Sequence, residues 1–262
     1  MPTTPLIAYA HVGKTFDGGR VVAVDDVSLD VAEGEFLAIV GGSGSGKTTL
    51  LRLANRLIEA DAGSITVEGE DVRSIDPILL RRRIGYVFQS GGLFPHLTVA
   101  DNIGITPKLT GTPPAEISAR VEELLDLVRL DRAQYRDRLP HELSGGQRQR
   151  VGVARALAAR PRIVLMDEPF GALDPLTRDA LGDDFRELHR RLGLTTVMIT
   201  HDMTEAILLA DRVAVMRGGK LLAQGTPSDL SKSGDAYVGE LLRTPRRQAE
   251  RLGALLPREG GA

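Results

Sequence analysis

Short apolar segments rich in β-branched residues recur along the chain, with turn-forming residues between them. We predict strands at Val21–Val31, Phe36–Val40, Ile65–Glu68, Ile84–Phe88, Ile163–Met166, Thr196–Thr200, Val213–Met216 and Lys220–Ala223. Several are continuous apolar runs, as expected for strands that are buried on both faces of a parallel sheet. Apolar residues at helical spacing predict helices at Lys47–Ile58, Ala115–Arg129, Gly146–Ala159, Pro175–Leu192 and Thr204–Leu209.

The alternation of strands and helices is typical of an α/β domain with a mainly parallel sheet. One stretch departs from it, because from about Gly91 to Arg155 the pattern predicts helices and loops but no strand. We therefore expect a helical insertion in the α/β core, at about residues 91–155. From about Gly225 the chain shows little periodicity, which predicts a short helix followed by a frayed end.

Composition narrows the class of protein. The chain has 262 residues, of which 42% are hydrophobic and 26% charged, as in ordinary globular domains. It has no cysteine, which excludes a disulfide framework and a cysteine nucleophile, and its net charge of −2 disfavours nucleic-acid binding through bulk charge. No apolar run approaches the roughly 20 residues of a membrane span, and the first ten residues lack a signal-peptide pattern. We expect a soluble, cytoplasmic protein.

A glycine-rich loop carries the most specific motif. Residues 41–48, GGSGSGKT, fit the phosphate-binding pattern G-x-x-x-x-G-K-[ST] between a predicted strand and a predicted helix. Backbone N–H groups of such a loop approach phosphates closely, and the helix N-terminus adds positive potential. We expect Lys47 to reach the β- and γ-phosphates and Thr48 to bind Mg²⁺. The nucleotide-binding residues expected here are Gly41, Gly42, Ser43, Gly44, Ser45, Gly46, Lys47, Thr48 and Thr49. A plain Gly/Ser turn is the competing interpretation, and the strand–loop–helix context disfavours it.

Two carboxylates follow the predicted strand Ile163–Met166. The carboxyl end of a parallel strand faces the ligand crevice, so Asp167 is placed to bind Mg²⁺. Glu168 lies one residue further on and is placed to orient or deprotonate a water molecule. A polar turn at the end of a strand would explain the pair equally well if it stood alone.

A second anion site is predicted at residues 143–147, LSGGQ, before a helix. The site would combine a hydroxyl, backbone without side chains and a helix N-terminus, from Ser144, Gly145, Gly146 and Gln147. One nucleotide needs only one phosphate loop, so this second site makes sense if it faces the ATP of another copy. A simple capping turn is the alternative interpretation.

These motifs together resemble the ATP-binding subunits of ABC transporters, over about residues 6–225. The loop 41–49 resembles their Walker A motif and residues 143–147 their signature. Asp167 and Glu168 resemble the Walker B aspartate and the catalytic glutamate. The remaining matches are Gln89 with the Q-loop glutamine, Ala172–Asp174 with the D-loop, and His201 with the switch histidine.

The resemblance implies a P-loop NTPase fold with a RecA-like, mainly parallel sheet, an N-terminal antiparallel β portion and an inserted α-helical subdomain. Residues 1–240 would form the ATPase domain, with the insertion at about 91–155, and residues 241–262 a short basic tail. That tail is expected to be a solvated end, the alternative being contact with anionic lipid. The chain stops at Ala262, too early for the C-terminal sensing module of many osmoprotectant importers.

The family pattern also implies how two copies work. They close head to tail around two ATP molecules with Mg²⁺, so that the signature residues 144–147 act in trans. Phe16 would stack on adenine, unless it is an ordinary core residue. The implied catalytic residues are Glu168, His201, Gln89 and Lys47; Thr48, Gln89 and Asp167 would contact the metal; and Asp174 would contribute to the nucleotide site.

The implied partners are a second copy, an integral membrane permease and, indirectly, an extracytoplasmic substrate-binding protein, with no nucleic acid. The chain would lie on the inner face of the plasma membrane, and residues 91–98 would receive a permease helix unless they form a packed loop. Four segments resemble importers of quaternary amines and osmoprotectants such as glycine betaine, choline, carnitine and proline: Asn55–Glu59, Gly69–Val72 with Arg81–Tyr86, Pro140–Leu143 and Met166–Pro175.

Three alternatives stay open. An importer of polar amino acids would use the same ATPase chemistry, although such importers more often carry a Thr-Ser pair where Phe170-Gly171 stands. A soluble ABC ATPase that remodels nucleic acid or ribosomes usually has two motif sets or long coiled-coil insertions, which are not seen here. A P-loop kinase or nucleotide switch would leave residues 143–147 and His201 without a role.

Overall fold

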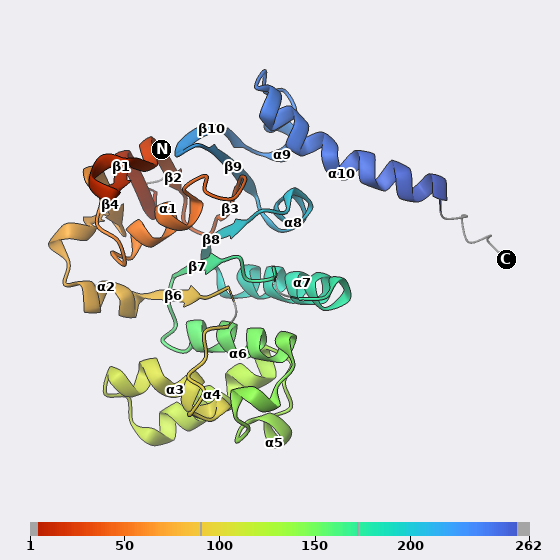
Figure 1. Ribbon diagram of the computed structural model, residues 1–262. Coiled ribbons are helices and arrows are strands. Elements are labelled where there is room, and N and C mark those ends of the chain that lie inside the picture. Colours follow the sequence, from red (N-terminus) through yellow and green to blue (C-terminus); the bar gives the residue numbers. More distant parts are fainter. Residues whose placement is uncertain (1–4, 90, 172, 256–262) are drawn as a thin grey trace.

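The computed structural model describes residues 5–89, 91–171 and 173–255, which form two sheets and the helices that cover them (Figure 1). The smaller sheet is antiparallel and has the order β2-β1-β4-β5. Its strands are β1 (Ile7–Phe16), β2 (Val21–Val31), β4 (Ala62–Val67) and β5 (Glu70–Asp71). This sheet is the predicted N-terminal antiparallel portion.

The larger sheet has the order β10-β9-β3-β8-β7-β6. All neighbours pair in parallel except β10, which pairs antiparallel with β9. Its strands are β3 (Phe36–Val40), β6 (Ile84–Val87), β7 (Ile163–Asp167), β8 (Thr195–Thr200), β9 (Arg212–Arg217) and β10 (Lys220–Gly225). Every residue of β3, β7 and β8 is buried, which explains their unbroken apolar sequences.

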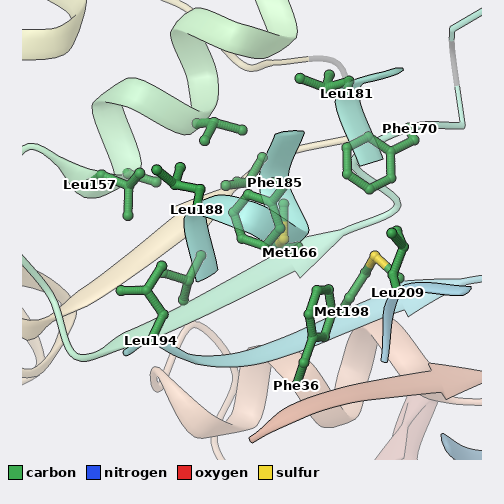
Figure 2. Close-up of a cluster of buried hydrophobic side chains, with 14 of the residues drawn as sticks. Phe36, Leu157, Met166, Phe170, Leu181, Phe185, Leu188, Leu194, Met198 and Leu209 are labelled. Carbon is green, nitrogen blue, oxygen red and sulfur yellow. The ribbon is translucent and has the colours of Figure 1, made fainter. Parts of the chain in front are cut away.

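Alternate residues of the central strands enter two different hydrophobic cores. Leu37 and Ile39 of β3 join the core formed with the antiparallel sheet and α1 (Lys47–Ala54). Phe36 enters the opposite core, where its ring meets Phe185 of α7 (Pro175–Leu192) edge to face at 5.9 Å. Figure 2 shows this second core, with Met198 beside Phe36. Truncation of Phe185 to alanine would cost about 3–5 kcal/mol.

The helical insertion is present, and between residues 91 and 155 the described chain forms only helices and connections. Its helices are α3 (Val99–Leu109), α4 (Pro114–Leu127), α5 (Arg132–Tyr135), η3 (Pro140–Glu142) and α6 (Gly145–Leu157). Figure 1 shows α3 to α6 grouped at one end of the molecule. The other helices are η1 (Asp17–Gly19), η2 (Val72–Ser74), α2 (Pro77–Arg83), α8 (Met203–Leu209), α9 (Pro227–Leu230) and α10 (Ala236–Leu255).

Two expectations about helix length are wrong. The helix predicted to reach Ile58 ends at Ala54, because the chain turns at Arg56, whose φ is 53°. A short helix, α9, does follow Gly225, but the frayed end expected after it is helical as far as Leu255, in α10, which has 20 residues and extends away from the body (Figure 1). Asp235 caps its start, and Val238 anchors its first turn in the core.

The predicted division at residue 240 falls inside α10, and residues 256–262 of the predicted tail lie outside the described residues. The division into an ATPase domain and a tail therefore stays a prediction. No helix in the described ranges has the length and apolar character needed to cross a membrane.

Candidate functional site

The glycine-rich loop 41–46 joins the end of β3 to the start of α1. Two of its glycines leave no room for a side chain. A Cβ on Gly46 would lie 2.0 Å from the carbonyl oxygen of Ala23, and one on Gly41 would lie 2.2 Å from that of Met216. Gly46 also has a φ of 97°, which favours glycine. The loop is thus clamped between β2 and β9 in a shape that requires bare backbone.

The side chain of Lys47 turns back into this loop. Its ammonium donates hydrogen bonds to the carbonyl oxygens of Gly41 and Gly42, at 2.8 and 2.9 Å, and to Ser45 Oγ at 3.3 Å. Burial lowers the pKa of Lys47, against the opposing attraction of two nearby carboxylates. A nucleotide phosphate would compete for this cation with neutral oxygens, which are weaker partners.

The magnesium ligands predicted from the sequence meet at the end of β7. Thr48 Oγ1 donates to Oδ1 of the buried Asp167 over 3.1 Å. A hydroxyl and a carboxylate are ligands that Mg²⁺ accepts, with water and substrate phosphates completing its octahedron. In the described ranges, no group of three or more His, Cys, Asp or Glu side chains is placed to hold a metal by itself. The donor set therefore fits a magnesium ion that binds together with a nucleotide.

The predicted catalytic residues come from three neighbouring strands. Glu168 follows β7, Gln89 follows β6, and His201 follows β8. Gln89 Nε2 donates to Oε2 of Glu168 at 3.0 Å, and His201 Nδ1 lies 3.4 Å from the same oxygen. Gln89, predicted also as a metal contact, bonds Glu168 rather than the Thr48–Asp167 pair.

The predicted signature forms the start of α6, away from the phosphate loop. Ser144 accepts from the N–H of Gln147 at 3.2 Å, and Gln147 Oε1 accepts from the N–H of Ser144 at 2.8 Å, as in a capping box. Gln147 also donates to the hydroxyl of Tyr135 at 2.9 Å. Within the described residues no hydrogen bond joins 144–147 to the loop 41–48. Ser144 and Gln147 therefore do cap the start of α6, and Ser144 and Gly145 remain exposed.

Two further predicted residues have clear structural settings. Asp174 caps α7 by accepting from the N–H of Thr177 at 3.0 Å, and the hydroxyl and N–H of Thr177 lower its pKa. Phe16 ends β1, and its side chain is 38% exposed, which is unlike a core phenylalanine. Ala172, the first residue of the predicted D-loop, lies outside the described residues.

Sequence analysis missed three residues that touch this site. Arg52 and Tyr86 both donate to Oδ2 of Asp167, at 3.1 and 3.2 Å. Tyr237 of α10 accepts from the N–H of Gly42 at 3.1 Å. Only Arg52 carried a signal, because it lies four residues after Thr48 and so shares its helix face.

The parallel sheet, the clamped phosphate loop and the strand-end carboxylates define a P-loop NTPase fold with an inserted helical subdomain. A sequence profile described as ABC transporter matches residues 24–171. The chain belongs to the ABC transporter family.

Relatives with known roles support the same assignment. The chain is 49% identical to the choline transport ATP-binding protein OpuBA of Bacillus subtilis over 242 residues, which are 92% of this chain and 63% of that protein. It is 50% identical to the glycine betaine uptake system ATP-binding protein YehX of Escherichia coli over 85% of this chain and 71% of that protein. The chain thus spans about 63% of the length of the OpuBA relative.

Solved structures agree with the fold. The ATP-binding cassette MJ0796, a dimer in a post-hydrolysis state bound to ADP and Pi, superposes with a TM-score of 0.75 at 32% identity, covering 84% of this chain and 98% of that one. The protein cbiO1 from Clostridium perfringens, part of the transporter complex cbiONQ, superposes with a TM-score of 0.81 at 27% identity, covering 95% and 99%.

Proposed function

We propose that this chain is the ATP-hydrolysing subunit of an ABC importer, which converts ATP and water to ADP and phosphate. The observation that carries the proposal is a convergence at the ends of neighbouring strands: Thr48 meets Asp167, and Gln89 and His201 meet Glu168. Phosphoryl transfer needs a cradle for phosphates, a metal carboxylate and a group that orients the nucleophile. This edge of the sheet supplies all three.

Each residue then has a definite task. The loop amides and Lys47 bind the phosphates and stabilise the charge that develops on them. Thr48 and Asp167 would hold Mg²⁺, which would supply further charge neutralisation to the phosphates.

The water molecule is handled by the adjacent group of residues. Glu168 accepts its proton, while His201 holds the γ-phosphate and the water in line. Gln89 fixes Glu168 from the opposite side. Phe16, exposed at the end of β1, stacks on the adenine ring.

Two copies close head to tail around two ATP molecules, each ATP lying between the phosphate loop of one copy and residues 144–147 of the other. Two observations support this arrangement. The signature is exposed and has no bond to the phosphate loop of its own chain within the described residues. The related cassette MJ0796 is dimeric. A helix N-terminus that faces the partner's γ-phosphate would complete the site.

A groove of about 490 Å³ beside β6 supports docking of a membrane permease. Phe88 and Phe94 line it, each 43% exposed. Arg155 donates to the carbonyl oxygens of Gly91 and Gly92, at 2.8 and 2.7 Å, and so holds these two residues in place beside the groove. An apolar groove beside backbone that is held in place suits the insertion of a short amphipathic helix. This segment overlaps the stretch 91–98 predicted from the sequence.

The transported cargo we propose is a quaternary amine or osmoprotectant such as glycine betaine, choline or carnitine. The support is the names of the relatives, which include a glycine betaine/carnitine/choline transport ATP-binding protein of Bacillus subtilis at 48% identity. A putrescine transport ATP-binding protein of Escherichia coli is 45% identical. The membrane subunits therefore determine the cargo more than the chemistry of the ATPase does. Docking on the permease would place the chain at the inner face of the plasma membrane, and an extracytoplasmic binding protein would deliver the cargo.

The test uses the full chain with Glu168→Gln, which keeps ATP binding and removes the proton acceptor. Tagged protein is incubated with ATP and membranes of its own cell, then purified and its partners identified. The matched control carries Lys47→Ala as well, so that the nucleotide no longer closes the dimer. We expect the Glu168→Gln chain to retain a multi-span hydrophobic protein, and the chain that also carries Lys47→Ala to lose it. Soluble ribosomal or nucleic-acid partners in its place would overturn the transport proposal.

Cargo is tested separately, by uptake of labelled choline and glycine betaine in cells that carry either the unaltered chain or Glu168→Gln. Loss of this uptake, with uptake of labelled polar amino acids unchanged, is expected. The reverse pattern would move the assignment to an amino-acid importer.

A further inference from the structure

Asp167 has two oxygens with different surroundings. Its Oδ1 accepts from Thr48 Oγ1 at 3.1 Å, on the side where the metal would bind. Its Oδ2 accepts from Arg52 Nη2 at 3.1 Å and from Tyr86 Oη at 3.2 Å. The carboxylate is buried, so rotation about its terminal bond is governed by these three partners.

We propose that Arg52 and Tyr86 are positioning residues for the magnesium carboxylate, which hold Oδ2 so that Oδ1 faces Thr48. The inference rests on the proposed function, since it concerns the metal that accompanies ATP. The two residues reach Asp167 from different elements, α1 and β6, so they fix the carboxylate from two directions.

The chemistry of the two donors suits this task. A guanidinium is always charged and cannot accept a hydrogen bond. Arg52 can therefore meet the carboxylate of Asp167 only as a donor. A phenol keeps its proton at neutral pH, so the hydroxyl of Tyr86 is a donor to this carboxylate. The ring of Tyr86 packs on Phe88 with centroids 4.6 Å apart, which holds the hydroxyl in place.

Tyr86→Phe isolates the effect, because it removes only the hydroxyl and keeps the ring contact. Tyr9→Phe is the matched control, since it removes a hydroxyl from the buried core of the antiparallel sheet, and within the described residues that hydroxyl has no hydrogen bond. Arg52→Met removes the second donor, and Arg52→Lys restores a positive charge without the planar fork. Asp167→Asn reports whether the metal site exists at all.

The measurement is binding of Mn²⁺, in place of Mg²⁺, by electron paramagnetic resonance in the presence of a non-hydrolysable ATP analogue. Affinity for the same analogue in EDTA is measured in parallel. Tyr86→Phe should raise the Mn²⁺ concentration at half-saturation by about 2- to 10-fold, the effect of one lost hydrogen bond. Arg52→Met should raise it by about 10-fold or more, since a charged donor is lost, and Arg52→Lys should recover part of the loss.

In EDTA the variants Tyr86→Phe, Arg52→Met and Arg52→Lys should bind the analogue like the unaltered chain. Unchanged Mn²⁺ binding in both Tyr86→Phe and Arg52→Met would overturn the proposal, and so would tighter Mn²⁺ binding in Arg52→Met, which would show that the arginine competes with the metal. Weaker binding in EDTA to the same degree would show a merely structural role. If Asp167→Asn also binds Mn²⁺ normally, the proposed metal site itself is wrong, which distinguishes the two failures.

Discussion

The side-chain amide of Gln89 donates a 3.0 Å hydrogen bond to Oε2 of Glu168. His201 approaches the same oxygen to 3.4 Å from the opposite neighbouring strand. Among the described residues, Oε1 of Glu168 has no hydrogen bond, so one oxygen is fixed and the other is available to a water molecule. This division suits a carboxylate that must keep its orientation while it accepts a proton.

Replacement of Gln89 by glutamate should disable this arrangement without enlarging the side chain. Two carboxylates at hydrogen-bond distance repel each other unless they share a proton, so Glu168 becomes a poorer proton acceptor. We expect kcat for ATP hydrolysis to fall by about 10- to 100-fold at pH 7, with part of the loss recovered at higher pH. The measurement is the pH dependence of kcat, with Gln89→Ala as control. If kcat of the Gln89→Glu variant declines at low pH over the same range as kcat of the unaltered enzyme, the prediction is wrong.

Alanine at Gly46 should abolish nucleotide binding and lower the melting temperature. The new Cβ would lie 2.0 Å from the carbonyl oxygen of Ala23, so the loop and β2 must move apart. Gly69 is the matched control, because its φ of 82° imposes the same left-handed strain while no atom lies within 4 Å of a Cβ there. Gly69→Ala should cost only about 1–2 kcal/mol and leave ATP affinity unchanged. Equal effects of the two variants, by calorimetry and nucleotide titration, would show that strain alone matters.

Two inactive chains should restore one active site when they are mixed. Lys47→Ala disables the phosphate loop, and Gly145→Asp places a negative charge at the signature. Gly145 tolerates the change in the free chain, because its Cβ would only touch Leu173 at 3.9 Å and the first turn of a helix favours an acidic residue. The mixed dimer pairs the intact loop of one chain with the intact signature of the other. ATPase activity in the mixture, absent from each variant alone, is expected; if both motifs act within one chain, the mixture stays inactive.

The buried His189 makes the stability of the fold depend on pH. Burial, with help from Arg186, lowers its pKa in the folded state, so below about pH 6.5 the unfolded chain binds a proton that the folded chain does not. Its contribution to stability is therefore complete near pH 8 and declines as the pH falls through the unfolded-state pKa. The slope from this group is at most about 1.4 kcal/mol per pH unit.

His189→Gln should flatten this dependence, since an amide can still meet the hydroxyl of Thr196, which lies 3.0 Å from Nδ1, without titrating. Urea unfolding at pH 5, 6, 7 and 8 compares the two chains. The variant will be less stable at pH 8, and its stability should decline less on acidification. Parallel curves would show that other groups set the pH dependence.

Much of the site could be predicted because its chemistry is local in sequence. Residues 41–48 contain both the bare backbone and the cation that a phosphate needs, and the carboxylates at 167 and 168 stand at the end of an unmistakable buried strand. The insertion was also visible, since 91–155 shows helical spacing without strands. The predicted roles of these residues stay predictions.

What the sequence did not reveal depends on contacts between distant segments. The hydroxyl of Tyr237 reaches Gly42 across 195 positions, and that of Tyr86 reaches Asp167 across 81, and no periodicity marks either tyrosine. Strand β1 was missed because it is irregular, with His11 at a φ of 53° and shifts in its pairing to β2. Helix α10 was underestimated because Pro245 lies inside it, although the segments on both sides continue the helix.

The order of strands in the larger sheet fixes the order of groups across the site. The chain reaches Lys47, Gln89, Glu168 and His201 in that sequence, but the sheet arranges them as β3, β8, β7 and β6, so His201 stands between Lys47 and Glu168. Neighbouring strands lie about 4.8 Å apart, so the four strands span roughly 14 Å. The order and spacing of the strands thus determine where each group meets the substrate. A slip of one strand by a single residue would move its group by about 3.3 Å, more than any hydrogen bond in this site could follow.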